Sequence, residues 1–214
     1  MSINVIYENK DMVVCVKPQG VISECGNGSL PEMLTQALNC EIFPVHRLDR
    51  ATGGIMVYAK NKKSAAALSS IIACGGMKKE YLAIVRGVPE AQADILTDFL
   101  YHDRIKNKSF VVKRGRNGVK TAVLNYKLLG SAEHNGQLLS LLQIRLQTGR
   151  THQIRVQFSH RGLPLYGDGK YGGRAEREGL ALWSFHLSLG EGKCYKSLPP
   201  DSFPWTLFEE NLPR

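Results

Sequence analysis

The chain has 214 residues, with 28 lysines and arginines against 19 aspartates and glutamates, so its formal net charge is +9. Hydrophobic residues make up 43% of the sequence, which suffices for a packed core, yet no apolar run of about 18 residues predicts a membrane-spanning helix. The first residues lack the basic start and the apolar stretch of a secretory signal peptide.

The beginning of the chain is predicted to form a strand pair followed by a helix. Two β-branched runs, residues 4–8 and 12–17, favour a hairpin or two adjacent strands. Ser29 lies three residues before Glu32 and is expected to cap the helix. The apolar stripe expected on this helix consists of Met33, Leu34, Ala37 and Leu38.

A strand, a second helix and another strand are predicted next. A loop leads into the apolar run at residues 54–60, which is typical of a buried strand. Residues 61–74 are predicted to form a helix that ends at Gly75-Gly76, since glycine commonly terminates helices. A strand is then expected at residues 78–87.

The remainder of the chain is predicted to consist mainly of strands. These are expected at residues 121–130, 138–147 and 180–189. Residues 107–118 resemble a basic hairpin. Thr151 is expected to cap a short helix over residues 151–160, which Gly162 stops.

The order of these elements predicts the fold class. Strands outnumber helices and mostly follow one another directly, which favours an α+β fold with a long, mixed, mainly antiparallel sheet and flanking helices over a doubly wound fold. The sequence shows neither a low-complexity linker nor an internal repeat. We therefore expect a single domain over residues 1–214.

The excess of positive charge is concentrated in one segment. Between Arg104 and Lys120 there are seven basic residues and no acidic one. Such a field favours a polyanionic partner, with nucleic acid first and an acidic membrane surface second. A solvated basic loop is the alternative, and composition does not distinguish RNA from DNA.

The usual signs of cofactor chemistry are missing from the sequence. The five cysteines are widely spaced without a Cys-x-x-Cys pair, which predicts neither disulfides nor a thiolate zinc site and favours reduced thiols in a cytoplasmic protein. No glycine-rich stretch has the spacing of a nucleotide-binding loop. The lone carboxylate of Asp49, between Arg47 and Arg50, is a candidate for side-chain chemistry, although a surface ion pair is the simpler reading.

Four segments carry a resemblance to a known family. The stretch HRLDRATGGIMVYAKN, residues 46–61, resembles the signature of RluA-type RNA pseudouridine synthases: His-Arg-Leu-Asp, two residues, Thr-Ser-Gly, an apolar strand and Ala-Lys. KKEYLAIVRG resembles the family's Lys-x-Tyr-x-Ala strand, and LQTGRTHQIRVQFSHRGLPLYGDGKYGG resembles its Thr-Gly-Arg-x-His-Gln-Ile-Arg segment with the following Gly-Asp-x-x-Tyr. LALWSFHLSL resembles its closing Leu-His-Ala strand.

The resemblance covers roughly residues 3–208, with two departures. Gly53-Gly54 replaces the usual Ser-Gly, and Trp183 stands where the last motif normally has histidine. Neither position is the expected nucleophile, so they bear on substrate details more than on activity. From the resemblance we expect a catalytic domain without the separate N-terminal RNA-binding module that many members carry.

The resemblance also implies roles for individual residues. Asp49 would be the catalytic carboxylate that converts uridine in RNA to pseudouridine, whether by attack on the base, attack on the sugar or removal of a sugar proton. Arg155 would hold Asp49 ionised, with Arg150 as the rival candidate. Tyr81 would stack on the target base and assist proton transfer at C5, although a tyrosine in a strand often serves packing alone. Arg47 would fill the space left by the flipped uridine, or else merely pair with Asp49.

Three further polar residues of the motifs are expected to have supporting roles. For His152 a structural hydrogen bond is expected rather than catalysis. Gln153 would orient the cleft or contact phosphate. Asp168 is interpreted as a turn residue that accepts hydrogen bonds from backbone N–H groups, not as a second catalytic carboxylate.

The leading hypothesis is therefore a cofactor-independent, metal-independent RNA pseudouridine synthase with a central RNA-binding cleft. Its expected partner is a ribosomal or transfer RNA stem-loop, without an obligatory protein partner, and a monomer is the default. A non-catalytic RNA-binding protein on the same fold is the alternative. A nucleoside hydrolase would want a second carboxylate near the first, and the motifs supply none.

Overall fold

The computed structural model describes residues 3–113, 117–190 and 192–213. The chain forms two compact units. The first contains the residues up to Glu80 together with Trp183–Pro199, and the second contains Tyr81–Leu182 and the residues from Pro200 onward. One domain over the whole chain stays a prediction. Within the described ranges, no helix is long and apolar enough to cross a bilayer.

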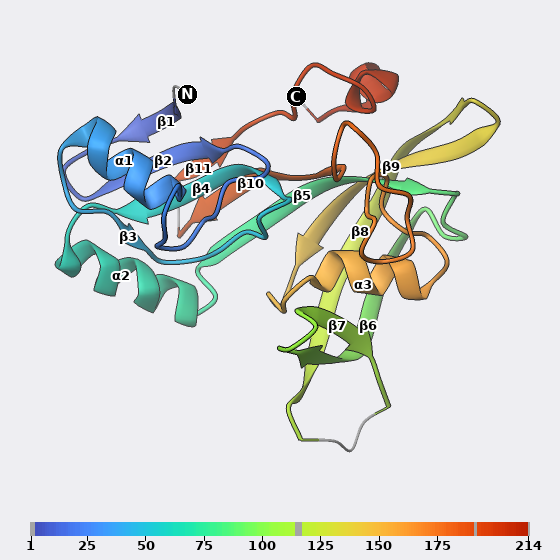
Figure 1. The fold of residues 1–214 in the computed structure, drawn as a ribbon, viewed down its shortest axis with the longest axis horizontal. Helices are drawn as coiled ribbons and strands as arrows, with labels where there is room; N and C mark the ends of the chain where they lie inside the picture. Colours follow the sequence, from blue (N-terminus) through green and yellow to red (C-terminus); the bar gives the residue numbers. More distant parts are fainter. Residues whose placement is uncertain (1–2, 114–116, 191, 214) are drawn as a thin grey trace. The chain divides into compact units, whose positions relative to one another are not determined.

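The first unit is built on a sheet of mostly short strands (Figure 1). Its strands are β1 (Asn4–Glu8), β2 (Met12–Lys17), β3 (Phe43–Pro44), β4 (Gly53–Ala59), the first residues of β5 (Met77–Arg86), β10 (Leu182–Leu189, from Trp183) and β11 (Cys194–Lys196). Four of these strands lie in the order β1-β2-β4-β10. In addition, β3 pairs with β4, and β11 pairs with β10. β1 and β2 are antiparallel, as the predicted hairpin requires, while β10 runs parallel to β4.

The two helices of the first unit begin where their caps predict. α1 (Leu30–Leu38) is capped by Ser29, whose Oγ accepts a hydrogen bond from the N–H of Glu32 at 3.3 Å. α2 (Lys62–Ala73) is capped by Asn61 and is followed by Gly75 with φ 73°, a left-handed conformation that suits glycine. The expected apolar stripe of α1 is only partly correct, because Leu34 is buried and Ala37 is exposed.

Side chains along β4 point alternately to the two faces of the sheet, and both faces are buried at this strand. Ile55, Val57 and Ala59 belong to an apolar cluster that includes Leu68 of α2. Residues between them face the opposite side of the sheet, as in any strand. There the hydroxyl of Tyr58 donates a hydrogen bond to the carbonyl of residue 23, at 3.0 Å, in the segment before α1.

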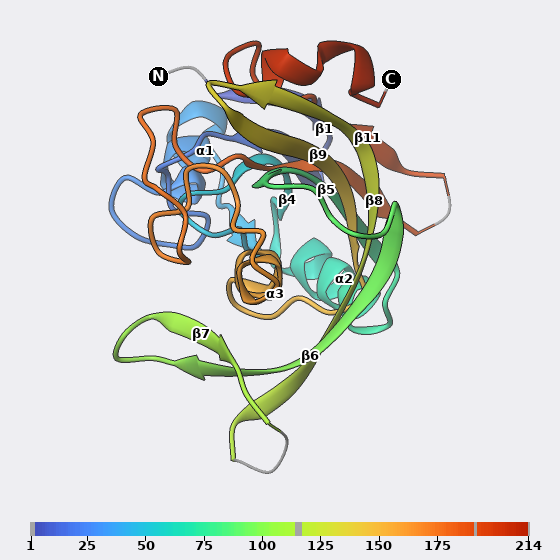
Figure 2. The same cartoon turned by 90° about the vertical axis from the view of Figure 1, so that its right-hand side faces the viewer.

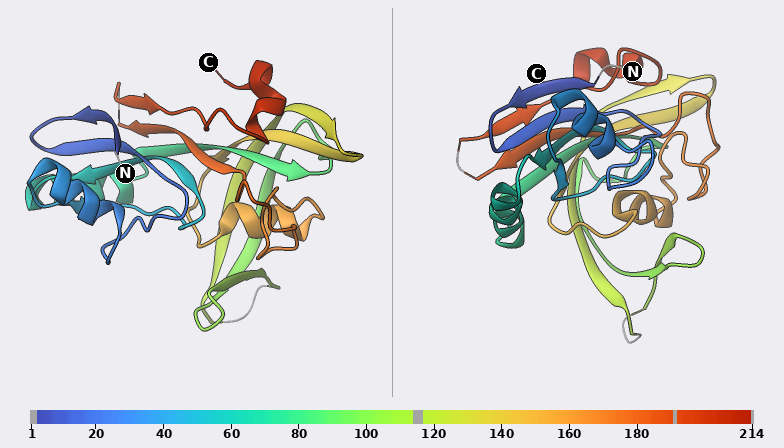
Figure 3. Two further views of the ribbon diagram at one scale, coloured as in Figure 1. Left: turned by 45° about the horizontal axis from the view of Figure 1, so that its top comes forward. Right: turned by 60° about the vertical axis from the view of Figure 1, so that its left-hand side comes forward.

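The second unit contains long antiparallel strands and one buried helix (Figure 2). Its elements are the rest of β5, β6 (Ala93–Asp103), β7 (Lys108–Val111), β8 (Val119–His134), β9 (Gln137–Leu146), α3 (Gln153–His160) and the 3-10 segment η1 (Trp205–Asn211). The strands lie in the order β9-β8-β6-β7. η1 contacts β8 (Figure 3).

One predicted helix boundary is wrong. α3 begins at Gln153, and the residue before it, His152, has φ 55° and no side-chain capping bond. Thr151 is therefore not the cap, although the helix does end near Gly162 as expected. β6 had no counterpart among the predicted strands. The mixed, mainly antiparallel sheet with few helices nevertheless confirms the α+β class.

Candidate active site

The residues predicted to form the active site are divided between the two units. Arg47 and Asp49 belong to the first unit, and Tyr81, Arg150 and Arg155 belong to the second. The central RNA-binding cleft, and the meeting of Asp49 with Arg155 in it, stay predictions. Each unit presents its own part of the site.

Asp49 lies in the loop between β3 and β4, and hydrogen bonds fix this loop on both sides of it. The hydroxyl of Ser23 donates to the carbonyl of Leu48 at 2.7 Å and accepts from the Leu48 N–H at 3.1 Å. On the other side, the Thr52 N–H donates to the Asp49 carbonyl at 3.0 Å. The position of the Asp49 backbone is thus set by the turn itself and by the segment before α1.

A buried lysine, which the sequence analysis did not single out, supports the same loop. Lys17 is 0% exposed, and its Nζ donates to the carbonyls of Pro18 and Val21 at 2.8 Å each and of Arg50 at 3.2 Å. Burial lowers the pKa of Lys17 to about 8, while the negative charge of Asp49 acts in the opposite direction. One feature of the sequence could have indicated this role: Lys17 ends an apolar strand directly before a Pro-Gln-Gly turn.

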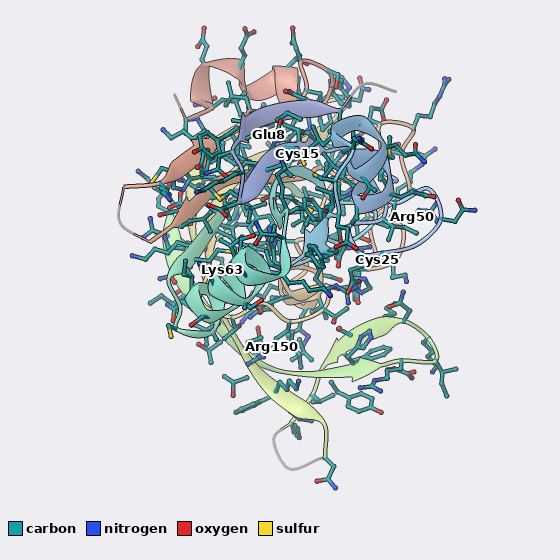
Figure 4. The ribbon with its side chains drawn as sticks, turned by 90° about the vertical axis from the view of Figure 1, so that its left-hand side faces the viewer. Glu8, Cys15, Cys25, Arg50, Lys63 and Arg150 are labelled. Carbon is teal, nitrogen blue, oxygen red and sulfur yellow. The ribbon has the colours of Figure 1, made fainter. Side chains whose placement is uncertain are left out.

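Arg50 completes this attachment through its backbone and its side chain. Its carbonyl accepts a hydrogen bond from the Gly20 N–H at 2.8 Å, and its Nε donates to the Gly20 carbonyl at 2.7 Å. Figure 4 labels Arg50 at the periphery of the first unit and Cys15 in its interior. All five cysteines lie within the described residues and are free thiols, and burial raises the pKa of Cys15 to about 12.

Arg47 forms an exposed ion pair. Its Nη1 lies 3.2 Å from Oε2 of Glu24, and the two side chains are 59% and 52% exposed. Exposed pairs of this kind contribute about 0–1 kcal/mol to stability. Arg47 can therefore leave Glu24 for another anionic or polar partner at small cost.

The two departures from the family signature, Gly53 and Trp183, touch each other. They are paired across β4 and β10. A Cβ added at Gly53 would lie 2.3 Å from Cζ3 of Trp183, so the indole ring occupies the space that a serine side chain would need. The indole Nε1 donates a hydrogen bond to the carbonyl of Ser197 at 2.9 Å. Gly53 and Trp183 are one packing solution rather than two separate changes.

In the second unit, Tyr81 lies in β5 and is 5% exposed. Arg155, in the first turn of α3, makes a bidentate ion pair with Asp168, from Nε to Oδ2 and from Nη2 to Oδ1 at 2.7 Å each. Both side chains are buried. Asp168 also accepts from the N–H groups of Lys170 at 3.1 Å and Tyr171 at 3.2 Å, which fits its predicted turn role. The ion pair with Arg155 was not predicted.

Side-chain hydrogen bonds fix the segment just before α3. Oε1 of Gln153 accepts from the N–H of Arg150 at 3.0 Å and from the hydroxyl of Thr148 at 2.8 Å. Nε of Arg150, which Figure 4 labels, donates to the carbonyl of Thr121 in β8 at 2.9 Å. The Nδ1 atom of His152 lies 2.8 Å from the hydroxyl of Tyr171, a structural hydrogen bond of the kind expected.

The basic segment is only partly described, because Arg114 and Arg116 lie outside the described residues. Lys106 and Lys113 are exposed. Lys108 instead lies over an aromatic ring, with its Nζ 5.2 Å from the centre of the Tyr171 ring. In the part of the chain that the structure describes, no group of three or more His, Cys, Asp or Glu side chains could hold a metal ion.

A comparison with protein families identifies the chain. The family model described as RNA pseudouridylate synthase matches residues 11–160, which include Asp49, Tyr81 and Arg155. The chain therefore belongs to the RNA pseudouridylate synthase family.

Curated relatives agree with this family. Ribosomal large subunit pseudouridine synthase D of Borreliella burgdorferi is 33% identical over 210 residues, which cover 90% of this chain and 63% of that protein. The protein of the same name from Xanthomonas campestris is 36% identical over 184 residues, which cover 81% of this chain and 53% of that protein. This chain thus spans less than two thirds of the length of either relative.

Two solved structures share the fold. Human RNA Pseudouridylate Synthase Domain Containing 1 gives a TM-score of 0.79 at 24% identity, over 96% of this chain and 86% of that one. Human RNA Pseudouridylate Synthase Domain Containing 4 gives a TM-score of 0.76 at 23% identity, over 92% of this chain and 89% of that one. These similarities confirm the predicted α+β fold.

Proposed function

We propose that this protein is an RNA pseudouridine synthase, an isomerase that converts specific uridines to pseudouridine. The observation that carries the proposal is Asp49, the acid of the family signature, held in a loop that hydrogen bonds of Leu48 and Thr52 fix on both sides. In the reaction the N-glycosidic bond breaks, the uracil turns, and its C5 bonds to C1′. A carboxylate can serve as the nucleophile in such a reaction.

The substrate is RNA in the cytoplasm, with ribosomal RNA as the first candidate and transfer RNA as the second. Support for ribosomal RNA comes from the names of the relatives, which specify the large ribosomal subunit. Support for a polyanion comes from the net charge of +9 and from the exposed Lys106 and Lys113 of the basic segment. Neither a cofactor nor a second protein enters this proposal.

Arg47 takes part in extrusion of the target base. A base inside a stem costs a few kcal/mol to flip out, and a side chain that fills the vacated space offsets this cost. The Arg47 guanidinium is well exposed and paired only with the exposed Glu24 in the contacts described above. Arg47 can therefore exchange its contact with Glu24 for a contact with RNA at a small cost in free energy.

Tyr81 and Arg155 complete the proposed site. Tyr81 would stack on the uracil and assist proton transfer at C5, and Arg155 would orient Asp49. The bidentate pair with Asp168 uses Nε and Nη2 of Arg155, which fixes the plane of the guanidinium. An arginine that orients a second carboxylate needs a guanidinium group whose plane is fixed.

The test is direct detection of pseudouridine. Ribosomal RNA and transfer RNA transcribed without modification are incubated with the purified chain in EDTA, and pseudouridines are mapped chemically. The unchanged chain is expected to modify defined uridines, and Asp49→Asn to modify none while binding RNA as tightly or slightly more tightly. Glu41→Gln, which removes the same charge from an exposed position of the first unit, is the matched control.

Three outcomes would contradict the proposal. Near-normal turnover by Asp49→Asn would reduce Asp49 to an ion-pair partner. Tight RNA binding without pseudouridine formation on any RNA by the unchanged chain would instead support the non-catalytic RNA-binding protein. A strict need for a divalent ion in the chemical step would contradict the metal-independent mechanism.

A further inference from the structure

The outer edge of β4 has a gap in its backbone hydrogen bonding. On the side away from β2, β10 pairs with Gly53 and Gly54, and β3 pairs with Tyr58 and Ala59. Among the described strands, none pairs with residues 55–57 on this side. Backbone groups buried in such a gap must find other partners, because an unpaired buried N–H or C=O group is costly.

Two side chains supply the missing partners. The hydroxyl of Ser184 donates to the carbonyl of Ile55 at 3.0 Å. Nε2 of His46 accepts from the N–H of Val57 at 3.1 Å. Because a backbone N–H can only donate, Nε2 of His46 must carry a lone pair, and in a neutral imidazole the proton is then on Nδ1.

This tautomer determines the state of a neighbouring lysine. Nδ1 of His46 lies 2.9 Å from Nζ of Lys79 in β5. An ammonium group has three donors and no acceptor, so it cannot accept a hydrogen bond from the protonated Nδ1. A neutral amine has the required lone pair. Burial lowers the pKa of Lys79 to about 8, so the neutral amine is the major form above that pH, and burial lowers the pKa of His46 well below 6.5.

We propose that His46 and Lys79 are positioning residues: Nδ1–H of His46 donates to a neutral Lys79 amine, and this pair anchors the loop that carries Asp49. Asp49 follows His46 by three residues, and the loop returns to β4 at Gly53. Val57 holds the imidazole from one side and Lys79 holds it from the other. The loop therefore starts from a fixed ring rather than from a free side chain.

The link to catalysis rests on the proposed function, whereas the hydrogen-bonded pair does not. The pair is tested first, without activity, by ¹⁵N–¹H correlation spectra of the histidine rings in the unchanged protein at about pH 9, where a Lys79 with a pKa of about 8 is mostly neutral. The result expected is a His46 ring with its proton on Nδ1 and an unprotonated Nε2, assigned by loss of the signal in His46→Gln. A proton on Nε2, or a doubly protonated ring, would overturn the pair.

Variants of Lys79 then test the positioning role. Lys79→Gln offers a carbonyl oxygen that can accept from Nδ1–H, and Lys79→Arg offers only donors and a permanent charge. We expect Lys79→Gln to keep most of kcat, and Lys79→Arg to lose about tenfold or more of kcat with KM nearly unchanged, since small misplacement of a catalytic group is costly. Lys78→Gln and Lys78→Arg, at the exposed neighbouring position, are the controls.

Variants of His46 supply an independent check. His46→Gln can still accept from the Val57 N–H, whereas His46→Phe keeps the ring shape and removes the acceptor. His46→Phe should lower kcat more than His46→Gln while both remain folded by circular dichroism. If Lys79→Arg or His46→Phe kept full kcat, the positioning role would be wrong. If the unchanged protein made no pseudouridine, the proposed function would fail. The ring spectra would still show whether His46 donates its Nδ1 proton to Lys79.

Discussion

Replacing Gly53 by serine should destabilise the protein chiefly through Trp183. The added Cβ would lie 2.3 Å from Cζ3 and 2.7 Å from Cε3 of the indole. Carbon atoms in contact prefer about 3.5–4.0 Å, so the ring must move by about 1 Å or more. Trp183 is 7% exposed and is held by its bond to Ser197, so there is little room for this movement.

The magnitude follows from these contacts. Overpacking of a filled core costs about 1–3 kcal/mol, and loss of the hydrogen bond to Ser197 adds about 1 kcal/mol. We therefore expect Gly53→Ser to lower the free energy of unfolding by about 2–4 kcal/mol. The backbone adds no strain, because Gly53, unlike Gly54 with φ 115°, does not have a left-handed conformation.

The assay is urea unfolding followed by circular dichroism. Gly26→Ser is the matched control, since a Cβ at Gly26 has open space and its φ is not left-handed. The smaller ring in Trp183→His should relieve the clash, so the double variant should cost at least 1 kcal/mol less than the sum of the single variants. Additive costs, or equal stabilities of Gly53→Ser and Gly26→Ser, would refute this reasoning.

Three further predictions concern charged groups. Arg155→Ala should lower the free energy of unfolding by about 3–5 kcal/mol, because it leaves the buried Asp168 carboxylate without its partner. Adding Asp168→Asn should recover part of this loss in the same urea assay, and no recovery would argue against a buried charge as the cause. Replacing Lys106 and Lys113 together by alanine should reduce the slope of log K against log salt by about 1 for each lysine in RNA-binding titrations, whereas an unchanged slope would place the hairpin off the RNA path. Folding lowers the pKa of Lys17 from 10.5 to about 8, so the unfolded chain binds more protons in this range and stability should rise as the pH increases between those values. Lys17→Met should remove that part of the rise in unfolding experiments across this pH range, and the same pH dependence in both proteins would contradict the shift.

Local patterns were sufficient for most of the fold. Ser29 and the Gly75 terminus act through their own neighbours in the chain, which is why the sequence predicts α1 and α2 almost to the residue. The start of α3 was misread because Gln153, rather than Thr151, folds back onto the N–H of Arg150. β6 was missed because only Leu96 and Leu100 of its residues are buried and its apolar pattern is interrupted by aspartates such as Asp98.

In the candidate site, too, the sequence predicts the residues of a local motif but not the contacts between distant segments. The family signature points to Asp49 directly, because its neighbours in the chain carry the motif. The contact of Lys17 with the Arg50 carbonyl and the contact of Lys79 with the His46 imidazole each join residues that are distant in sequence, so no local pattern reveals them. The contact of Gly53 with Trp183 is of the same kind, and the sequence could register only two unrelated departures.

The ion pair between Arg155 and Asp168 has a consequence for how this protein can evolve. Four donors converge on the Asp168 carboxylate, two from Arg155 and two from the backbone of the following turn. A lineage that lost Arg155 first would carry a buried anion, and one that lost Asp168 first would carry a buried cation. Both intermediates are disfavoured. Positions 155 and 168 should therefore be inherited together, and homologous sequences that change one should have changed the other.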